Sequence, residues 1–446
     1  MLKAGLRKTR ELASGQIARA SMMSVAITIT GLGLGFGQAV LSARLLGATG
    51  YGRVLVPMAI VQIVGLLGLS GYAGLAVREI PARIATGDAG GLTAFVRHAF
   101  LMVVGLSAAA TVVLVIVAVD TNLVGPEYRE TLEIGALIVV PFALIGLFRG
   151  LAQGFGRVAQ AQAPSELIRP GVMFLPLAVI ALLGLPFGPL TYMWFSLGTA
   201  LVSMLAAALW LWRSERARLS ARAQSERARH FVAALPFLGL GLVDTLQGQI
   251  NTLLLGTFAS PHEAGVFQPI VRLTPVLTLP VMAAAMRFGP RIAELWQNRD
   301  IERIRWITRT FTWTTSLLTL GLALSIAVAG PWLMSIFGPE FRQSAPLLWY
   351  VAGAQVFNAA CGPAGWLLAM SGRSGSTLAG QIAGLAVNAV VGVILIPLHG
   401  ALGAAIALAL GIIVWNVTTL AMATAHYRFN PSVLGFFFRQ NGSVSS

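Results

Sequence analysis

The residues with the most chemical capacity in this sequence are polar side chains set inside long apolar stretches. Arg272 follows Gln268 by four residues, and Asp244 is followed by Gln247 and then Asn251 at spacings of three and four. Residues three or four apart share one face of a helix. Each group therefore predicts a polar helix face. A guanidinium is always charged and its fork of donors matches a phosphate, so Arg272 predicts binding of a phosphate-bearing ligand.

The stretches around these residues are those of a membrane protein. Of the 446 residues, 56% are hydrophobic and 11% are charged, with a mean hydropathy of +0.78, whereas a soluble domain has about 25% charged residues. A charge at mid-bilayer costs about 2.5–3.5 kcal/mol, so Arg272 and Asp244 are expected to face protein or water. Arg272 is expected either to bind phosphate or to pair with Asp244 as a structural ion pair. Asp244 is expected to contact the substrate, to couple to a cation or to make that pair. Arg44 and Arg53 either extend a cationic path outward or anchor the chain at the membrane interface.

Residues for covalent or acid–base catalysis are not grouped in this sequence. The five histidines lie near expected helix ends, and none has a Cys, Asp or Glu at the spacing of a metal site. A single cysteine, Cys361, excludes an internal disulfide. The glycine-rich run at 31–37 is apolar and has no strand or basic residue beside it, so it favours close helix packing over a phosphate loop. We therefore expect no enzyme activity, no cofactor and no metal.

Twelve apolar segments approach the length of about 20 residues that a membrane-spanning helix needs. They lie at residues 17–43, 53–75, 97–119, 132–152, 165–185, 189–212, 231–257, 265–287, 307–329, 345–370, 377–397 and 401–425. The fifth and tenth are interrupted, by Arg169-Pro170 and by Pro363. In the eighth, Pro269, Pro275 and Pro280 predict a bent or broken helix, because proline removes a backbone donor and clashes with the preceding turn.

Basic residues lie almost entirely on one side of these segments. Only Arg44, Arg53, Arg129 and Arg342 fall in loops on the side opposite the N-terminus, whereas the stretch 213–230 alone carries six arginines. By the positive-inside rule, both termini and this stretch are cytoplasmic. The net charge of +15 is then a topology signal rather than a sign of nucleic-acid binding, because no soluble domain is available to carry a binding face.

The two halves of the chain contain the same short sequence motifs at matching positions. Gly-Pro-Glu-Tyr-Arg at 125–129 returns as Gly-Pro-Glu-Phe-Arg at 338–342, and Gly52 matches Gly265 at the same offset. This repeat indicates that the chain consists of two copies of a block of six helices.

This repeat predicts an all-α polytopic membrane protein of two six-helix lobes. Because each block starts and ends on the same side, a pseudo-two-fold axis along the membrane normal should relate the lobes. The repeat offset aligns Gln38 of the first helix with Asn251 of the seventh. The predicted domains are a cytoplasmic tail (1–16), an N-lobe (17–212), a basic linker (213–230), a C-lobe (231–426) and a second cytoplasmic tail (427–446).

Several short motifs follow one another along the chain. They are Ala43-Arg44-Leu45-Leu46-Gly47 with Gly50-Tyr51-Gly52, then Ala264-Gly265-Val266-Phe267, the Gly-Pro-Glu-Phe-Arg turn, and Leu395-Ile396-Pro397-Leu398-His399-Gly400. Together they resemble the polysaccharide transporter family, which contains the bacterial oligosaccharide flippases and belongs to the multidrug, oligosaccharidyl-lipid and polysaccharide exporter superfamily. The resemblance covers about residues 21–427. It implies two lobes around a central cavity lined by the first, second, seventh and eighth helices. Where the seventh helix of the family often carries an acid, this chain has Asn251.

The resemblance also implies a function. It is that of a flippase in the bacterial cytoplasmic (inner) membrane, which translocates an undecaprenyl-diphosphate-linked saccharide, such as an O-antigen or exopolysaccharide unit, by alternating access. The residues expected to contact the headgroup and its diphosphate are Gln38, Arg44, Arg53, Asn251, Gln268 and Arg272, and those expected to couple to an ion or form an ion pair are Asp244 and Gln247. The expected partners are the lipid-linked oligosaccharide, membrane lipids and polysaccharide polymerase or export machinery, without nucleic acid.

Two alternatives remain open. A cation-coupled drug exporter of the same superfamily would use Asp244 as its acidic site. A membrane glycosyl polymerase or ligase would need a large polar outer loop with catalytic side chains, and the loops on that side are short and hold only four basic residues.

Overall fold

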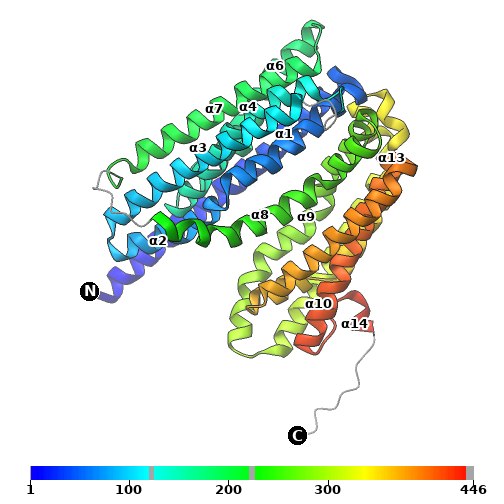
Figure 1. Ribbon diagram of the computed structural model, residues 1–446. Helices are drawn as coiled ribbons and strands as arrows, with labels where there is room; N and C mark the ends of the chain where they lie inside the picture. Colours follow the sequence, from blue (N-terminus) through cyan, green and yellow to red (C-terminus); the bar gives the residue numbers. More distant parts are fainter. Residues whose placement is uncertain (1, 120–124, 220–226, 438–446) are drawn as a thin grey trace. The chain divides into compact units, whose positions relative to one another are not determined.

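The computed structural model describes residues 2–119, 125–219 and 227–437, and its regular structure in these ranges is entirely helical (Figure 1). The centre of the predicted linker, 220–226, and the end of the predicted second tail, 438–446, lie outside the described residues. The elements in chain order are α1 (Leu2–Leu69), α2 (Tyr72–Thr86), α3 (Ala89–Val119), α4 (Arg129–Gly154), α5 (Val158–Ala163), η1 (Pro164–Ile168), α6 (Arg169–Leu183), α7 (Pro189–Glu215), α8 (Arg227–Phe258), α9 (Pro261–Gln297), α10 (Ile301–Phe337), η2 (Pro339–Ser344), α11 (Leu347–Ala360), α12 (Ala364–Met370), α13 (Ser374–Tyr427) and α14 (Val433–Phe437).

The predicted fold class, an all-α polytopic membrane protein with about twelve spans, is confirmed. Nine stretches of helix in the described residues are long and apolar enough to cross a membrane. Two of them, Met22–Thr86 and α13, each hold two predicted spans. The tenth predicted span is divided between α11 and α12, which have 14 and 7 residues and are each too short to cross alone. The nine stretches therefore account for the other eleven predicted spans.

Two glycines mark the places where consecutive spans are joined without a loop. Gly47 interrupts α1 with φ 64° and ψ 172°, and Gly400 interrupts α13 with φ 53° and ψ −129°. A side chain at such a positive φ is strained, so glycine is the residue that lets the chain change direction there. Each long helix therefore consists of two arms that meet at a kink.

Proline shapes three of the predicted spans in different ways. The fifth continues through a π-helical turn, η1, in which the Arg169 backbone N–H bonds to the Pro164 oxygen. The tenth breaks between Ala360 and Ala364, around a proline that follows a glycine with positive φ. The eighth predicted span lies in a single continuous helix, α9 (Pro261–Gln297). Of the two predicted alternatives, a bent or a broken helix, the broken one is therefore excluded.

The chain divides into two compact units. Unit 1 contains residues 1–46 and 53–245, and unit 2 contains residues 47–52 and 246–446. In unit 1, α4 packs against α2, α3 and α7, and in unit 2, α13 packs against α9, α11 and α12. The predicted domain boundaries and the symmetry axis stay predictions.

Small residues bring the helices of unit 1 close together. A Cβ at Gly150 of α4 would lie 2.5 Å from the Ala73 backbone of α2, which is closer than real side chains approach. Membrane helices pack in this way because lipid supplies no hydrophobic drive between them, so close van der Waals contact stabilises their association.

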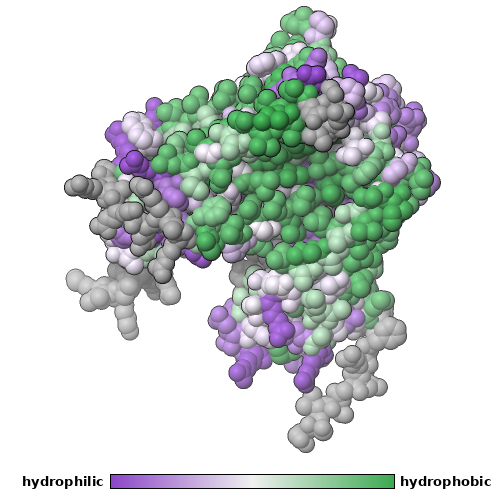
Figure 2. Space-filling model, viewed as in Figure 1, coloured by the Kyte–Doolittle hydropathy of each residue, from purple (hydrophilic) through white to green (hydrophobic). Residues whose placement is uncertain are grey.

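Large apolar side chains cover much of the outer surface. The most exposed include Leu182 and Val328, at 85% and 81% of their accessible area. Figure 2 shows hydrophobic residues as broad green areas along the flanks of the helices. A soluble protein rarely exposes contiguous apolar surface of this extent. The protein is therefore a multi-pass membrane protein, with these flanks in contact with lipid.

Candidate functional site

The polar residues of α8 face three different environments. Asp244 is exposed, Gln247 is half-buried, and Asn251 is buried at 5% exposure. Gln247 Nε2 donates to the backbone oxygen of Gln381 at 3.3 Å, on the first arm of α13. The Asn251 side-chain oxygen has no hydrogen-bond partner among the described atoms. The predicted polar face of the seventh helix therefore exists, and its last two members lie in unit 2.

A small cavity lies in unit 2 beside Gln247. It has a volume of about 90 Å³, and α13 supplies the other lining residues, among them Asn388 and Trp415. Asn388 is buried at 4% exposure, and its side-chain oxygen also has no partner in the described part of the chain. Because water in the liquid occupies about 30 Å³, this space fits about three water molecules or one partly hydrated small ion. The amide groups can solvate a cation or a hydroxyl group, and they supply no charge of their own.

Glycines let the two arms of α13 approach each other at this cavity. A Cβ on Gly384 of the first arm would lie 2.6 Å from the Gly411 oxygen of the second, and a Cβ on Gly411 would lie 2.8 Å from Asn388 Cβ. The cavity thus sits at one of the places where the two arms come close together. Sequence reasoning missed Asn388; its only signal was an amide inside the apolar segment 377–397.

The two predicted residues of α9 differ in their exposure. Gln268 is buried at 9% exposure, whereas Arg272, one turn later, is exposed. The first turn of α9 is capped by Ser260, whose side chain accepts the Glu263 backbone N–H at 3.3 Å. The guanidinium of Arg272 is thus accessible on a helix whose start is fixed.

The predicted residues of α1 lie in unit 1. Gln38 is half-buried and its Nε2 donates to the Tyr192 hydroxyl of α7 at 3.3 Å. Arg44 and Arg53 are both exposed. Burial and the charge of Glu127 raise the pKa of Tyr128, and the nearby positive charge of Arg53 works against that rise. Arg53 is therefore close enough to the start of α4 to act electrostatically there.

The segment 47–52 makes two contacts within unit 2 that account for its sequence motif. The Ala48 backbone N–H donates to Glu340 Oε1 at 2.8 Å, so the carboxylate caps the second arm of α1. A Cβ on Gly52 would overlap the Pro261 carbonyl group, and a Cβ on Gly265 would overlap that of Ala48. The two glycines related by the sequence repeat thus allow one close helix contact.

The kink of α13 uses the same arrangement. The Ala401 backbone N–H, directly after Gly400, donates to Glu263 Oε2 at 2.7 Å. From the sequence, Glu340 was expected only as part of a repeated turn, and Glu263 had no predicted role. The signal available was a glutamate at the end of each of two spans, but the partners lie 292 and 138 residues away in the chain.

A further carboxylate, half-buried in unit 1, lies on the π-helical turn η1. Glu166 accepts the Thr28 hydroxyl at 3.0 Å and forms an ion pair with Arg149 at 3.4 Å. A π-helical turn inside a helix often marks a functional position. In the described residues, no group of three or more His, Cys, Asp or Glu side chains could hold a metal ion.

Comparison with known proteins places the chain in a family. The model of a family described as polysaccharide biosynthesis protein matches residues 17–296, which is more than half of the chain. The chain belongs to this family. The predicted membership of the polysaccharide transporter family is confirmed.

One curated relative of this polysaccharide biosynthesis family member is a probable low-salt glycan biosynthesis flippase, Agl15, from Haloferax volcanii. The two are 24% identical over 200 residues, which is 44% of this chain. The matched part spans only 41% of that relative's length.

Solved structures of superfamily transporters share the fold. A multidrug transporter of the MATE family in its inward-facing conformation has a TM-score of 0.70 at 16% identity, over 91% of this chain and 98% of that one. A transporter of the same superfamily from Pyrococcus furiosus has a TM-score of 0.60 at 15% identity, over 92% and 96%. At these identities the likeness shows the fold, which is the predicted two-lobe transporter fold.

Proposed function

We propose that this polysaccharide biosynthesis family member is a flippase. It moves a polyprenyl-diphosphate-linked oligosaccharide, the repeat unit of a polysaccharide, across a membrane by alternating access. The observation that carries this proposal is the family match over residues 17–296. Two further findings support it: the relative from Haloferax volcanii carries the name of a glycan biosynthesis flippase, and the fold is that of superfamily transporters.

The exposed arginine of α9 is the proposed contact for the diphosphate. Arg272 is accessible on a membrane-spanning helix, and guanidinium binds phosphate oxygens through paired donors. Buried Gln268 orients that turn of α9 or forms a hydrogen bond to the sugar. The further proposed contacts with the headgroup are Gln38, Arg44, Arg53 and Asn251.

Asp244 and Gln247 are proposed to couple transport to a cation. The amide-lined cavity beside Gln247 supports this assignment because the Asn388 oxygen, which has no partner among the described residues, can coordinate a cation or accept a hydrogen bond from its hydration water. Pairing of Asp244 with Arg272 is the competing role for both charges.

The proposed setting is the bacterial cytoplasmic membrane, with both termini cytoplasmic. The arginines of loops on one side of the spans support this orientation. The protein acts as a transporter rather than an enzyme, and polysaccharide polymerase or export machinery is the proposed partner.

The test is a chromosomal Arg272→Ala variant. Polysaccharide export stops, lipid-linked repeat units accumulate, and immunoblots of membrane fractions show wild-type amounts of protein. Gln62→Ala on α1, a half-buried amide whose Nε2 donates to the Met58 oxygen of the same helix, is the control and leaves export unchanged. Wild-type export by Arg272→Ala would remove this residue from the mechanism.

A further inference from the structure

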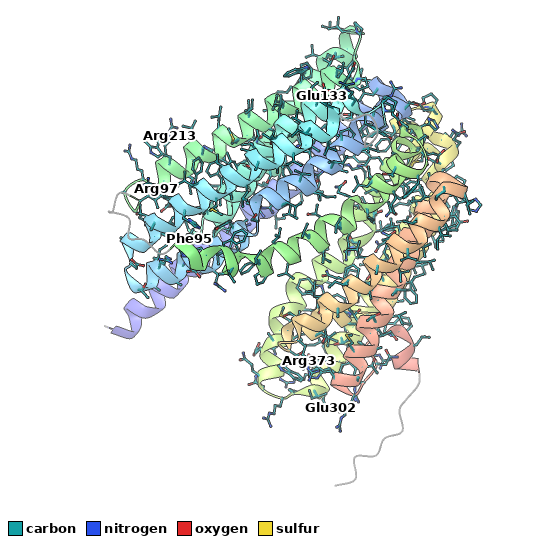
Figure 3. The ribbon with its side chains drawn as sticks, in the orientation of Figure 1. Phe95, Arg97, Glu133, Arg213, Glu302 and Arg373 are labelled. Carbon is teal, nitrogen blue, oxygen red and sulfur yellow. The ribbon has the colours of Figure 1, made fainter. Side chains whose placement is uncertain are left out.

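One end of unit 2 gathers several helix ends and an excess of positive charge. α9 ends there and α10 begins, and α13 ends beside them, because Ile292, Ile304, Leu367, Tyr427 and Phe429 form one buried cluster. Figure 3 shows Arg373 and Glu302 at this end of the unit, and Figure 2 shows hydrophilic residues gathered there.

The acidic residues at this end are already matched to neighbouring arginines. Glu294 pairs with Arg291 at 2.7 Å, Asp300 with Arg303 at 3.3 Å, and Glu302 with Arg305 at 4.0 Å. Three other arginines, Arg299, Arg373 and Arg428, are exposed, and no carboxylate of the described residues lies within ion-pair distance of them. This end therefore carries positive charge that the described chain does not neutralise.

Arg299 occupies a backbone conformation that normally favours glycine. Its φ is 57°, and it follows the last residues of α9, with its N–H bonded to the Trp296 oxygen and the Asp300 N–H bonded to the Leu295 oxygen. Glycine adopts this left-handed position after a helix without strain, whereas a side chain does not. An arginine kept at such a position is a candidate for a functional role.

Arg299 lines a cavity that is open to the surface. The cavity has a volume of about 410 Å³, and Trp296 and Ile301 form the rest of its lining. The Trp296 ring lies 5.1 Å from the ring of His426, and Arg373 acts electrostatically on that histidine. The space thus combines an arginine with no ion-pair partner among the described residues, an aromatic residue and a second positive charge nearby.

Tryptophans place this end at the level of lipid headgroups. Trp296 is half-buried beside the cavity, and Trp306, on the first turns of α10, is 68% exposed. Tryptophan is enriched at membrane–water interfaces, where its ring lies among the headgroups. Basic clusters at this level attract anionic lipids.

We propose that the cavity at Arg299 binds the phosphate group of an anionic membrane lipid. The Arg299 guanidinium bonds the phosphate oxygens, Trp296 contacts the glycerol and the first carbons of the chains, and Arg373 and Arg428 favour a headgroup with net negative charge. This binding is separate from the substrate contact at Arg272, so it does not depend on the proposed flippase activity.

The test is lipid binding to the full-length protein in neutral detergent, followed by native mass spectrometry. Phosphatidylglycerol is the probe, and phosphatidylcholine, which carries the same phosphate with a neutralising cation, is the comparison. The wild-type protein binds phosphatidylglycerol at least about tenfold more tightly than phosphatidylcholine. Arg299→Gln lowers the affinity for phosphatidylglycerol by about tenfold or more, because it removes a charge-assisted hydrogen bond to the phosphate. Equal binding of the two lipids would overturn the proposal.

A charge-matched control separates a local site from general attraction. Arg291→Gln removes the same charge from the same end of the unit, but Arg291 already pairs with Glu294, so its affinity loss stays under about threefold. Equal losses in Arg291→Gln and Arg299→Gln would overturn a site at Arg299. Arg299→Gly also loses binding while its thermal stability equals or exceeds that of the wild type, since glycine accepts the left-handed conformation.

Inorganic phosphate identifies the source of the phosphate group. It does not displace phosphatidylglycerol at equal concentration, because it lacks the glycerol and chains that contact Trp296. Displacement at equal concentration would show a site for free phosphate and would overturn the lipid assignment.

Discussion

Gly52→Ala tests the helix contact that fixes the segment 47–52 in unit 2. The added Cβ would lie 2.5 Å from the Pro261 carbonyl carbon and closer still to its oxygen, whereas real Cβ contacts are essentially never under 3.0 Å. The two backbones must therefore separate by more than half an ångström, and no side-chain rotation can relieve the overlap. Overpacking of this kind costs about 1–3 kcal/mol, and we expect the upper end because both groups belong to helices.

The expected change in stability follows from two opposing effects. Alanine favours a helix over glycine by about 1 kcal/mol, so an overlap cost of about 3 kcal/mol leaves a net loss of about 2 kcal/mol. At about 2–4 °C per kcal/mol for a domain of 150–250 residues, the unfolding midpoint falls by about 4–8 °C. Intrinsic tryptophan fluorescence of the purified protein in detergent, recorded during heating, measures this shift.

Two further variants make the comparison specific. Gly33→Ala, also on α1, has nothing within 4 Å of the added Cβ, so it keeps or raises the midpoint. Gly265→Ala, which overlaps the Ala48 carbonyl group, lowers it as Gly52→Ala does. Because both act on one contact, the double variant loses less than the sum of the two. A midpoint for Gly52→Ala equal to that of Gly33→Ala would refute the reasoning.

Three other predictions concern single side chains. Glu263→Ala leaves the Ala401 backbone N–H at the α13 kink without its carboxylate partner and lowers the free energy of unfolding by about 1–2 kcal/mol. A fall in the thermal midpoint measures this loss. The control Glu302→Ala, at an exposed side chain of α10, changes the midpoint little. Asn388→Leu removes the buried oxygen that is proposed to bind a cation or its hydration water, so it lowers the midpoint by several degrees, at about 1–3 kcal/mol for the polar groups left without this partner. A higher midpoint would show that the oxygen is unsatisfied in the wild type and would contradict that role. Asp244→Asn abolishes the response of transport in proteoliposomes to a proton or sodium gradient, and a wild-type rate that ignores both gradients would contradict ion coupling.

The spans were predictable from sequence because the bilayer sets their length. Apolar runs of about 20 residues separated by polar turns define the segments, and the chain has little other polar surface to obscure them. Arg169-Pro170 and Pro363 correctly indicated that the fifth and tenth spans were irregular. The sequence could not identify which of its 49 glycines adopt positive φ, so the direct joining of spans at Gly47 and Gly400 was not foreseen.

The helix face that some of the polar residues share was also predictable. Spacing along one helix placed Gln247 and Asn251 on a shared face of α8, and Gln247 lies beside a cavity. The roles of these residues stay predictions. Contacts made across the chain could not be predicted: Glu340 bonds a backbone group 292 residues away, and no property of the glutamate itself identifies that partner.

Transfer of a lipid-linked saccharide between leaflets tests the central claim most directly. The purified protein is reconstituted in liposomes with a fluorescent polyprenyl-diphosphate-linked oligosaccharide, and a glycosidase added outside reports the fraction of headgroups in the outer leaflet. The account predicts that wild-type protein brings inner-leaflet headgroups within reach of the enzyme and that Arg272→Ala does not. Liposomes that export a cationic drug but leave the inner-leaflet saccharide protected would contradict it.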